Sequence, residues 1–439
     1  MDDFSLDFEW IDPLGAKGAE LRATWARLSI VVDGYPVTRV YDDRSKTVRD
    51  AVYLPLYPLA EWLVTQWWPL WNEPGPPLAD RPGYDTRHSL VSAREGYALP
   101  PLRIHPAGSM VMLSWSPELL TFHGLEFQGR GAFWTKTSLV KAKFSSLITA
   151  VVGRLENYEI TDTLMQQDWE AIQSADPEEK KFCRCAGSLG LDPYSLDENQ
   201  QQEIEKAADR LPEEMLTEFF RAARRTELIA DAEEIRDAFS RAQSNEEDLT
   251  SLRELRHAAE GWIDFSGSMP WEQGYSFAQR MRTHLGLNGA PLKSIKTIAH
   301  ALGTTEESLS KVMTKFSDRE TPFVALMGVN AKLSPVFVTR EARTTAHMFY
   351  LCRALFEYLA SSNQRGALIT EANTEQQKRN RAFAAELLAP ASALRARIRI
   401  PIITWDQAEE VAEEFGVSAY IIRHQLENHH IASVQTYDT

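Results

Sequence analysis

The stretch RTTAHMFYLCRALFEYL, from Arg343 to Leu359, has apolar residues at three- and four-residue spacing, which predicts a largely buried helix. The helix carries one histidine, His347. A second metal-binding side chain on the same helical face would stand four residues later, where the chain has Leu351. The stretch therefore has the sequence pattern of a metal-binding helix but lacks the second of the two ligands.

Helices and strands alternate on both sides of this stretch. Upstream, TPFVALMGVN and SPVFVT predict strands, GYSFAQRMRTHLGL predicts a helix, and PLKSIKTIAHALGTTEESLSKVM predicts two helices around a Gly-Thr-Thr corner. Downstream, the run FAAELLAP (Phe383 to Pro390) is followed by a helix pair that ends in VSAYIIRHQLENHHI. We expect an α+β domain over 271–439.

This order of elements resembles the ImmA/IrrE family of zinc metallopeptidase domains. The likeness is carried by the helix ending in LGL, the helix pair with LG, the strand with VN, the Ala-His helix and FAAELLAP, which is the most specific match. It covers roughly the last two-fifths of the chain. The resemblance implies a zincin-like fold for 271–439.

In that family the metal helix reads HExxH, in which two histidines bind zinc and the glutamate acts as general base on the bound water. Here His347 keeps the first position, Met348 replaces the base and Leu351 replaces the second histidine. An alternative register places Phe349 and Arg353 at the two histidine positions. The first register loses the base and the second ligand, and the alternative register is no better.

The third ligand of the family is a glutamate shortly before FAAELL, where this chain has Gln377, with Glu375 close by. Catalytic zinc needs three protein ligands and a water. The resemblance therefore implies a pseudo-peptidase with no confident catalytic or metal-binding residue and no zinc cofactor.

A relocated metal site is the alternative. In IRHQLENHHI, His424 and Glu427 fall on one helix face. His347, Glu375 and His424 are the weak candidate ligands of an active metallopeptidase with rearranged ligands, which would cleave a regulator protein.

Two segments also have the pattern of a helix-turn-helix, KTIAHALGTTEESLSKVM and AEEVAEEFGVSAYIIRHQLENHH. The second helix of each segment carries few cations. Lys311 and Lys315 lie in or just after this helix in the first segment, and Arg423 lies in it in the second segment. A DNA-binding transcriptional regulator is thus a further alternative, although we expect nucleic acid not to be the main partner.

The region before 271 predicts two further parts. Residues 1–136 predict a β-rich domain, with two strands around the DGYP turn and another strand pair in SMVMLSWSPELLTFHGLEF. Residues 137–262 predict a helical middle region, followed by a hinge near GWIDFSGSMPWEQG, and WNEPGPPLADRPGYD predicts an exposed loop. Tryptophans crowd the first part and indicate either core or a partner-binding surface: Trp10, Trp25, Trp62, Trp67, Trp68, Trp71, Trp115 and Trp134.

Composition narrows the class of protein. A net charge of −15 argues against a chain that coats nucleic acid. We find no signal peptide and no stretch of about 18 apolar residues, so we expect a cytoplasmic protein without a membrane span. Three cysteines are too few for a disulfide framework, and Cys183 and Cys185 are expected to be structural thiols on a helix.

Together these features predict an α+β multidomain protein that binds another protein, a regulator or a component of a bacterial stress-response, mobile-element or phage-defence system. Its oligomeric state is not predicted.

Overall fold

The computed structural model describes residues 3–12, 17–75, 83–118, 123–262, 269–317, 319–361 and 364–435. The chain divides into two compact units, Met1–Ile204 and Glu205–Thr439. The division falls inside the helical region 137–262, and the three predicted domain ranges remain predictions. Residues 263–268 of the predicted hinge and 76–82 of the predicted loop lie outside the described residues.

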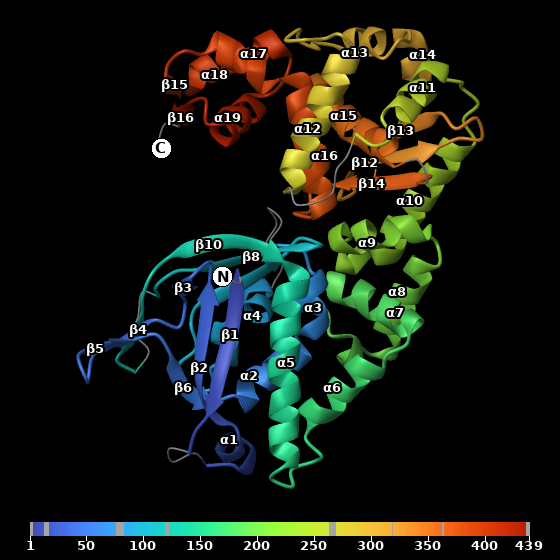
Figure 1. The fold of residues 1–439 in the computed structure, drawn as a ribbon. Helices are drawn as coiled ribbons and strands as arrows, with labels where there is room; N and C mark the ends of the chain where they lie inside the picture. Colours follow the sequence, from blue (N-terminus) through green and yellow to red (C-terminus); the bar gives the residue numbers. More distant parts are fainter. Residues whose placement is uncertain are drawn as a thin grey trace. The chain divides into compact units, whose positions relative to one another are not determined.

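The first unit combines short sheets with helices (Figure 1). Its elements are β1 (Phe4–Trp10), α1 (Ala19–Ala23), β2 (Trp25–Val32), β3 (Tyr35–Pro36), β4 (Val40–Asp42), β5 (Thr47–Arg49), β6 (Val52–Pro55), α2 (Tyr57–Thr65), α3 (Trp67–Asn72), α4 (Tyr84–His88), β7 (Leu102–Pro106), β8 (Met110–Trp115), β9 (Leu125–Phe127), β10 (Gly131–Lys136), α5 (Thr137–Glu156), α6 (Leu164–Ser174) and α7 (Pro177–Ser188). Helix α8 (Glu198–Ala208) spans the division between the units.

The predicted DGYP hairpin is confirmed. Strand β2 pairs antiparallel with β3, and Val32 faces Tyr35 across a turn in which Asp33 and Gly34 both have positive φ, at 49° and 74°. Glycine adopts such angles without steric cost, which explains the Asp-Gly sequence at this turn. The second predicted strand pair is wrong, because β8 pairs with β7 and β10 whereas β9 pairs with β4.

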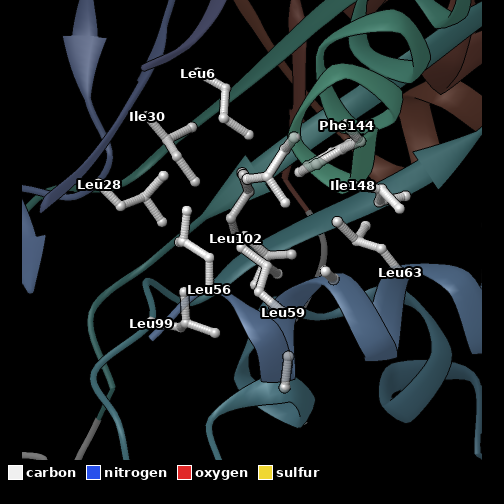
Figure 2. Close-up of a cluster of buried hydrophobic side chains, with 14 of the residues drawn as sticks. Leu6, Leu28, Ile30, Leu56, Leu59, Leu63, Leu99, Leu102, Phe144 and Ile148 are labelled. Carbon is white, nitrogen blue, oxygen red and sulfur yellow. The ribbon is translucent and has the colours of Figure 1, made fainter. Parts of the chain in front are cut away.

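The core of the first unit lies between the sheet that contains β2 and helices α2 and α5. Figure 2 shows Leu28 and Ile30 of β2 directed toward Leu59 of α2 and Phe144 of α5, and all four side chains are fully buried. Several of the tryptophans belong to this core as well, since Trp25, Trp67, Trp68, Trp71 and Trp115 are each at most 8% exposed. These five are therefore core residues and not a partner-binding surface.

The second unit has one main sheet surrounded by helices (Figure 1). Its elements are α9 (Glu213–Ala222), α10 (Leu228–Gln243), α11 (Thr250–Ala258), α12 (Pro270–His284), α13 (Ile295–Ala301), α14 (Glu306–Lys311), β11 (Met313–Lys315), β12 (Phe323–Val329), β13 (Pro335–Thr339), α15 (Thr344–Ala360), β14 (Gly366–Thr370), α16 (Glu375–Leu388), α17 (Ala391–Arg397), β15 (Ile402–Thr404), α18 (Trp405–Phe415), α19 (Ala419–Asn428) and β16 (Ser433–Gln435).

The main sheet has the order β11-β13-β12-β14, in which only β11 and β13 run parallel. Every residue of β12, β13 and β14 is buried, so both faces of these strands are covered. Helices α9, α10 and α15 contact the sheet, and α15 also packs against α16. The predicted strands TPFVALMGVN and SPVFVT and the predicted helix at Arg343–Leu359 are confirmed.

Helices α12 and α16 lie unusually close together. A Cβ atom on Gly274 of α12 would lie only 2.2 Å from the backbone oxygen of Arg379 in α16. Only glycine permits this approach of two backbones. The close contact fixes the position of α16, which carries several of the cavity side chains described below.

The molecule is a mixed α and β protein with several small sheets, which confirms the predicted fold class at this level. Cys183 and Cys185 are buried on α7, as predicted, and burial raises the pKa of Cys183 to about 11. In the parts of the chain that the structure describes, no helix is long and apolar enough to cross a membrane.

Candidate functional site

A cavity of about 1030 Å³ lies within the second unit, beside the stretch Arg343–Leu359. Helices α12, α15, α16 and α19 and the segment between β14 and α16 line it. Two hydrogen bonds tie α19 into this wall: Gln425 donates to Glu386 of α16 at 2.9 Å, and Asn428 donates to the Tyr275 hydroxyl of α12 at 3.1 Å. The volume of the cavity is at the upper end of the range for ordinary small-molecule pockets.

Arg353 lies between this cavity and the interior. Its side chain is only 1% exposed, although it stands in the middle of an apolar helix. Nε donates to Asn380 at 2.8 Å, and Nη2 donates to Gln377 at 2.8 Å and to the Thr370 carbonyl at 2.6 Å. Burial, and then the neighbouring Arg381, lower the pKa of Arg353 to about 9, so the guanidinium is still charged at neutral pH.

The third nitrogen of this guanidinium, Nη1, differs from Nε and Nη2 in its hydrogen bonding. Nη1 of Arg353 makes no hydrogen bond to any residue in the described ranges, and Arg353 is one of the residues that line the cavity. Nη1 is not one of the fully buried, unpartnered polar atoms of the described residues, so it is open to a further acceptor. The cavity is thus the side from which a further acceptor can reach Arg353.

Two buried carboxylates complete the network behind Arg353. Gln377 donates from Nε2 to Glu218 of α9 at 2.9 Å, and Asn380 donates from Nδ2 to Glu357 at 2.8 Å. Burial raises the pKa of Glu357 to about 7. The amide side chains of α16 therefore connect one buried cation to two acids, and each amide is already engaged.

Two more cations of α16 line the cavity. Arg381 donates to the carbonyls of Ala372 at 3.1 Å and Thr370 at 3.3 Å, and it lies 3.6 Å from Glu371. Lys378 is half-buried, and burial, followed by the charge of Arg381, lowers its pKa to about 8. The cavity therefore brings three cations together with one carboxylate, Glu371.

Aromatic rings form much of the rest of the wall. Trp271 and Tyr275 come from α12, Phe349 and Tyr350 from α15, and Tyr420 from α19. The guanidinium of Arg353 lies 6.0 Å from the centroid of the Phe349 ring. A cationic end and flat apolar walls are thus present in one cavity.

The sequence candidates are placed as follows. The ring of His347 hydrogen-bonds the Thr339 hydroxyl of β13 at 2.8 Å, and burial followed by Lys315 lowers its pKa. Met348 and Leu351 are each 1% exposed and belong to the core. These three residues do not line the cavity.

The positions of the alternative register do come together. Phe349 and Arg353 line the cavity, and Arg353 contacts Gln377 directly. Of the relocated candidates, His424 lines the cavity, whereas Glu375 pairs with Arg379 at 2.7 Å and does not line it.

Zinc is therefore a poor fit for this site. Within the described parts of the chain, no three His, Cys, Asp or Glu side chains lie where they could hold one metal ion. His347, Glu375 and His424 thus do not form such a group. The guanidinium of Arg353, charged at neutral pH, would also repel a divalent cation.

Sequence reasoning missed Lys378 and Arg381. Their signal was the basic run Lys378-Arg379-Asn380-Arg381, which ends one residue before FAAELL. Helical spacing places Lys378 and Arg381 on one face of α16, three residues apart.

A second buried charged cluster lies in the first unit. Arg87 donates to the buried Glu73 at 2.6 and 2.7 Å, and His88 lies 3.2 Å from it. Burial raises the pKa of Glu73, but the hydrogen bonds from His88 and Arg87 outweigh it and hold the pKa at about 2. This cluster holds α4 to the end of α3 and has a structural role.

Comparison of the chain with family models, with curated proteins and with solved structures gives no match.

Proposed function

We propose that the chain is a catalytically degenerate ImmA/IrrE-like protein, with a zincin-like domain over 271–439, that acts by binding another protein. The observation that carries this proposal is the hydrogen bond between Arg353 and Gln377. In the register that aligns LCRALF with the family, these residues stand at the second and third metal-ligand positions. A guanidinium and an amide that bond each other there leave no ligand free for zinc.

The position of the general base supports the same reading. In this register Tyr350 stands where the family has its glutamate, and its hydroxyl accepts a hydrogen bond from Arg340 at 2.7 Å. A phenol hydroxyl engaged by an arginine is not the carboxylate that the family uses as its base. In the first register the base position is Met348, which has no basic atom.

The placement of the elements is compatible with a peptidase-like frame. The helix that carries these positions, α15, packs on the main sheet and against α16, which contains FAAELL. Without a metal or a base, the function left to such a frame is recognition. A partner protein in a bacterial stress-response, mobile-element or phage-defence system belongs to this proposal by analogy with the family. A cytoplasmic location belongs to it as well, on the sequence features given above.

The test is the zinc content of chain purified without chelator, measured by inductively coupled plasma mass spectrometry. We expect far less than one zinc per chain. About one zinc per chain that is lost in His347→Ala or His424→Ala would instead support an active site with rearranged ligands.

A further inference from the structure

The charge of the cavity differs from that of the chain. The protein carries a net charge of −15, yet Arg353, Lys378 and Arg381 line one cavity in which Glu371 is the only acidic lining residue among those that the structure describes. That single carboxylate lies 3.6 Å from both Arg340 and Arg381. The cavity is therefore a local cationic site in an acidic protein.

Arg353 supplies a second, independent observation. Its side chain is 99% buried, three of its hydrogen bonds hold it in place, and Nη1 makes none within the described residues. A carboxylate or phosphate oxygen is the acceptor that a guanidinium binds most strongly. The fixed orientation means that little conformational entropy is lost when such an oxygen binds.

The remaining walls select the rest of a ligand. Trp271, Phe349 and Tyr420 present ring surfaces, and Ala382 and Ala385 of α16 leave space between them. Flat rings pack favourably on such side chains in stacked or edge-on geometry. A small inorganic anion alone would leave most of about 1030 Å³ unfilled.

We propose that this cavity binds a small aromatic anion, with its carboxylate or phosphate on Arg353, Arg381 and Lys378 and its ring against the aromatic wall. This inference goes beyond the proposed function and does not rest on it, because the cavity would hold such a ligand whether or not the chain binds a protein. A bound anion also satisfies Nη1 of Arg353.

Isothermal titration calorimetry at pH 7.5 with two probes, 1-naphthyl phosphate and 1-naphthoate, tests the proposal and separates phosphate from carboxylate. We expect one site per chain, and affinity for at least one probe about tenfold or more above that for 1-naphthol or inorganic phosphate. Arg381→Gln and Lys378→Gln should each weaken this binding about five- to tenfold.

Arg397→Gln is the matched control, since Arg397 is an exposed arginine of the same unit that pairs with Glu414 and does not line the cavity. It should leave the affinity unchanged. Arg353→Met should abolish binding, and because this variant can lose stability, the two α16 variants carry the test on their own. The proposal is overturned if neither probe binds at about 10 mM, if 1-naphthol binds as tightly as the anions, or if the α16 variants bind like the wild type.

Discussion

Nη2 of Arg353 and the side-chain oxygen of Gln377 are 2.8 Å apart, although 24 positions separate the two residues in the chain. The contact joins α15 to α16 at the point where the ImmA/IrrE resemblance would place two ligands of one zinc ion. A guanidinium there would repel a divalent cation, and its Nη1 makes no hydrogen bond within the described residues, on a side chain that lines a cavity.

The Arg353 network should be strongly coupled. Arg353→Met removes one donor each from Asn380, Gln377 and the Thr370 carbonyl, and we expect a loss of about 2–4 kcal/mol in the free energy of unfolding. In a double-mutant cycle with Gln377→Leu, urea unfolding should give a coupling energy of about 1–3 kcal/mol. The same cycle with the distant Arg397→Gln should be additive, and additivity in both cycles would contradict the network.

The stability of the second unit should depend on the ionisation of Glu357. Its folded pKa, about 7, is above the ordinary 4.5, so its contribution is complete below pH 4.5 and is lost as the pH rises through 7. Glu357→Gln imitates the protonated acid and can still accept from Asn380. We expect wild type and variant to be similar at pH 4.5, and the variant to be more stable by about 1–3 kcal/mol at pH 8.

Hydrogen exchange of the α15 amides at the two pH values measures this difference locally. Glu414→Gln, an exposed acid that pairs with Arg397, serves as the control and should show no such dependence. An equal effect of Glu357→Gln at both pH values would show that the acid is ionised throughout.

Gly274 should be intolerant of any side chain. Gly274→Ala would place Cβ 2.2 Å from the Arg379 oxygen and 2.9 Å from Cβ of Ala382, so α12 and α16 must separate. We expect a loss of about 1–3 kcal/mol in urea unfolding, despite the better helix propensity of alanine. Gly153→Ala in α5 is the comparison, because no atom lies within 4 Å of its new Cβ, and it should be neutral or stabilising.

Anion binding in the cavity should weaken at alkaline pH. The groups around Lys378 are Glu375 and Arg381 on its own helix, Glu371 before it, Arg353 on α15 and His424 on α19. Because the pKa of Lys378 is about 8 without ligand, a bound anion must compete with its deprotonation above that pH. Affinity for 1-naphthyl phosphate should therefore fall between pH 7.5 and 9.5, and fall less in Lys378→Gln; an identical slope in both proteins would exclude Lys378 from the site.

Local sequence patterns predicted the individual helices and strands of this protein better than they predicted which strands pair with each other. The periodicity of Arg343–Leu359 and the β-branched runs of β12 and β13 predicted those elements because helix and strand preferences are local. The pairing of β8 with β9 was wrong because the partner of a strand depends on residues far along the chain, here β7, β10 and β4.

The candidate site was also hard to predict, because it depends on contacts between residues that are far apart in the chain. The sequence shows which residues stand where the resembling family has its ligands, but not that Arg353 and Gln377 bond each other, because that contact depends on how α15 lies against α16. Two of the cavity cations, Lys378 and Arg381, were missed for a related reason. A basic run such as Lys378-Arg379-Asn380-Arg381 is usually a solvated helix face, and only the burial of Lys378 distinguishes it.

A titration of the wild-type chain with zinc, followed by calorimetry, tests the central claim most directly. The comparison is a variant that carries the family's residues at the four compared positions, Phe349→His, Tyr350→Glu, Arg353→His and Gln377→Glu. We expect no binding to the wild type at about 100 µM zinc and a gain of one site in the variant. One micromolar zinc site in the wild type, removed by His347→Ala or His424→Ala, would contradict the claim that a guanidinium has taken the place of the metal.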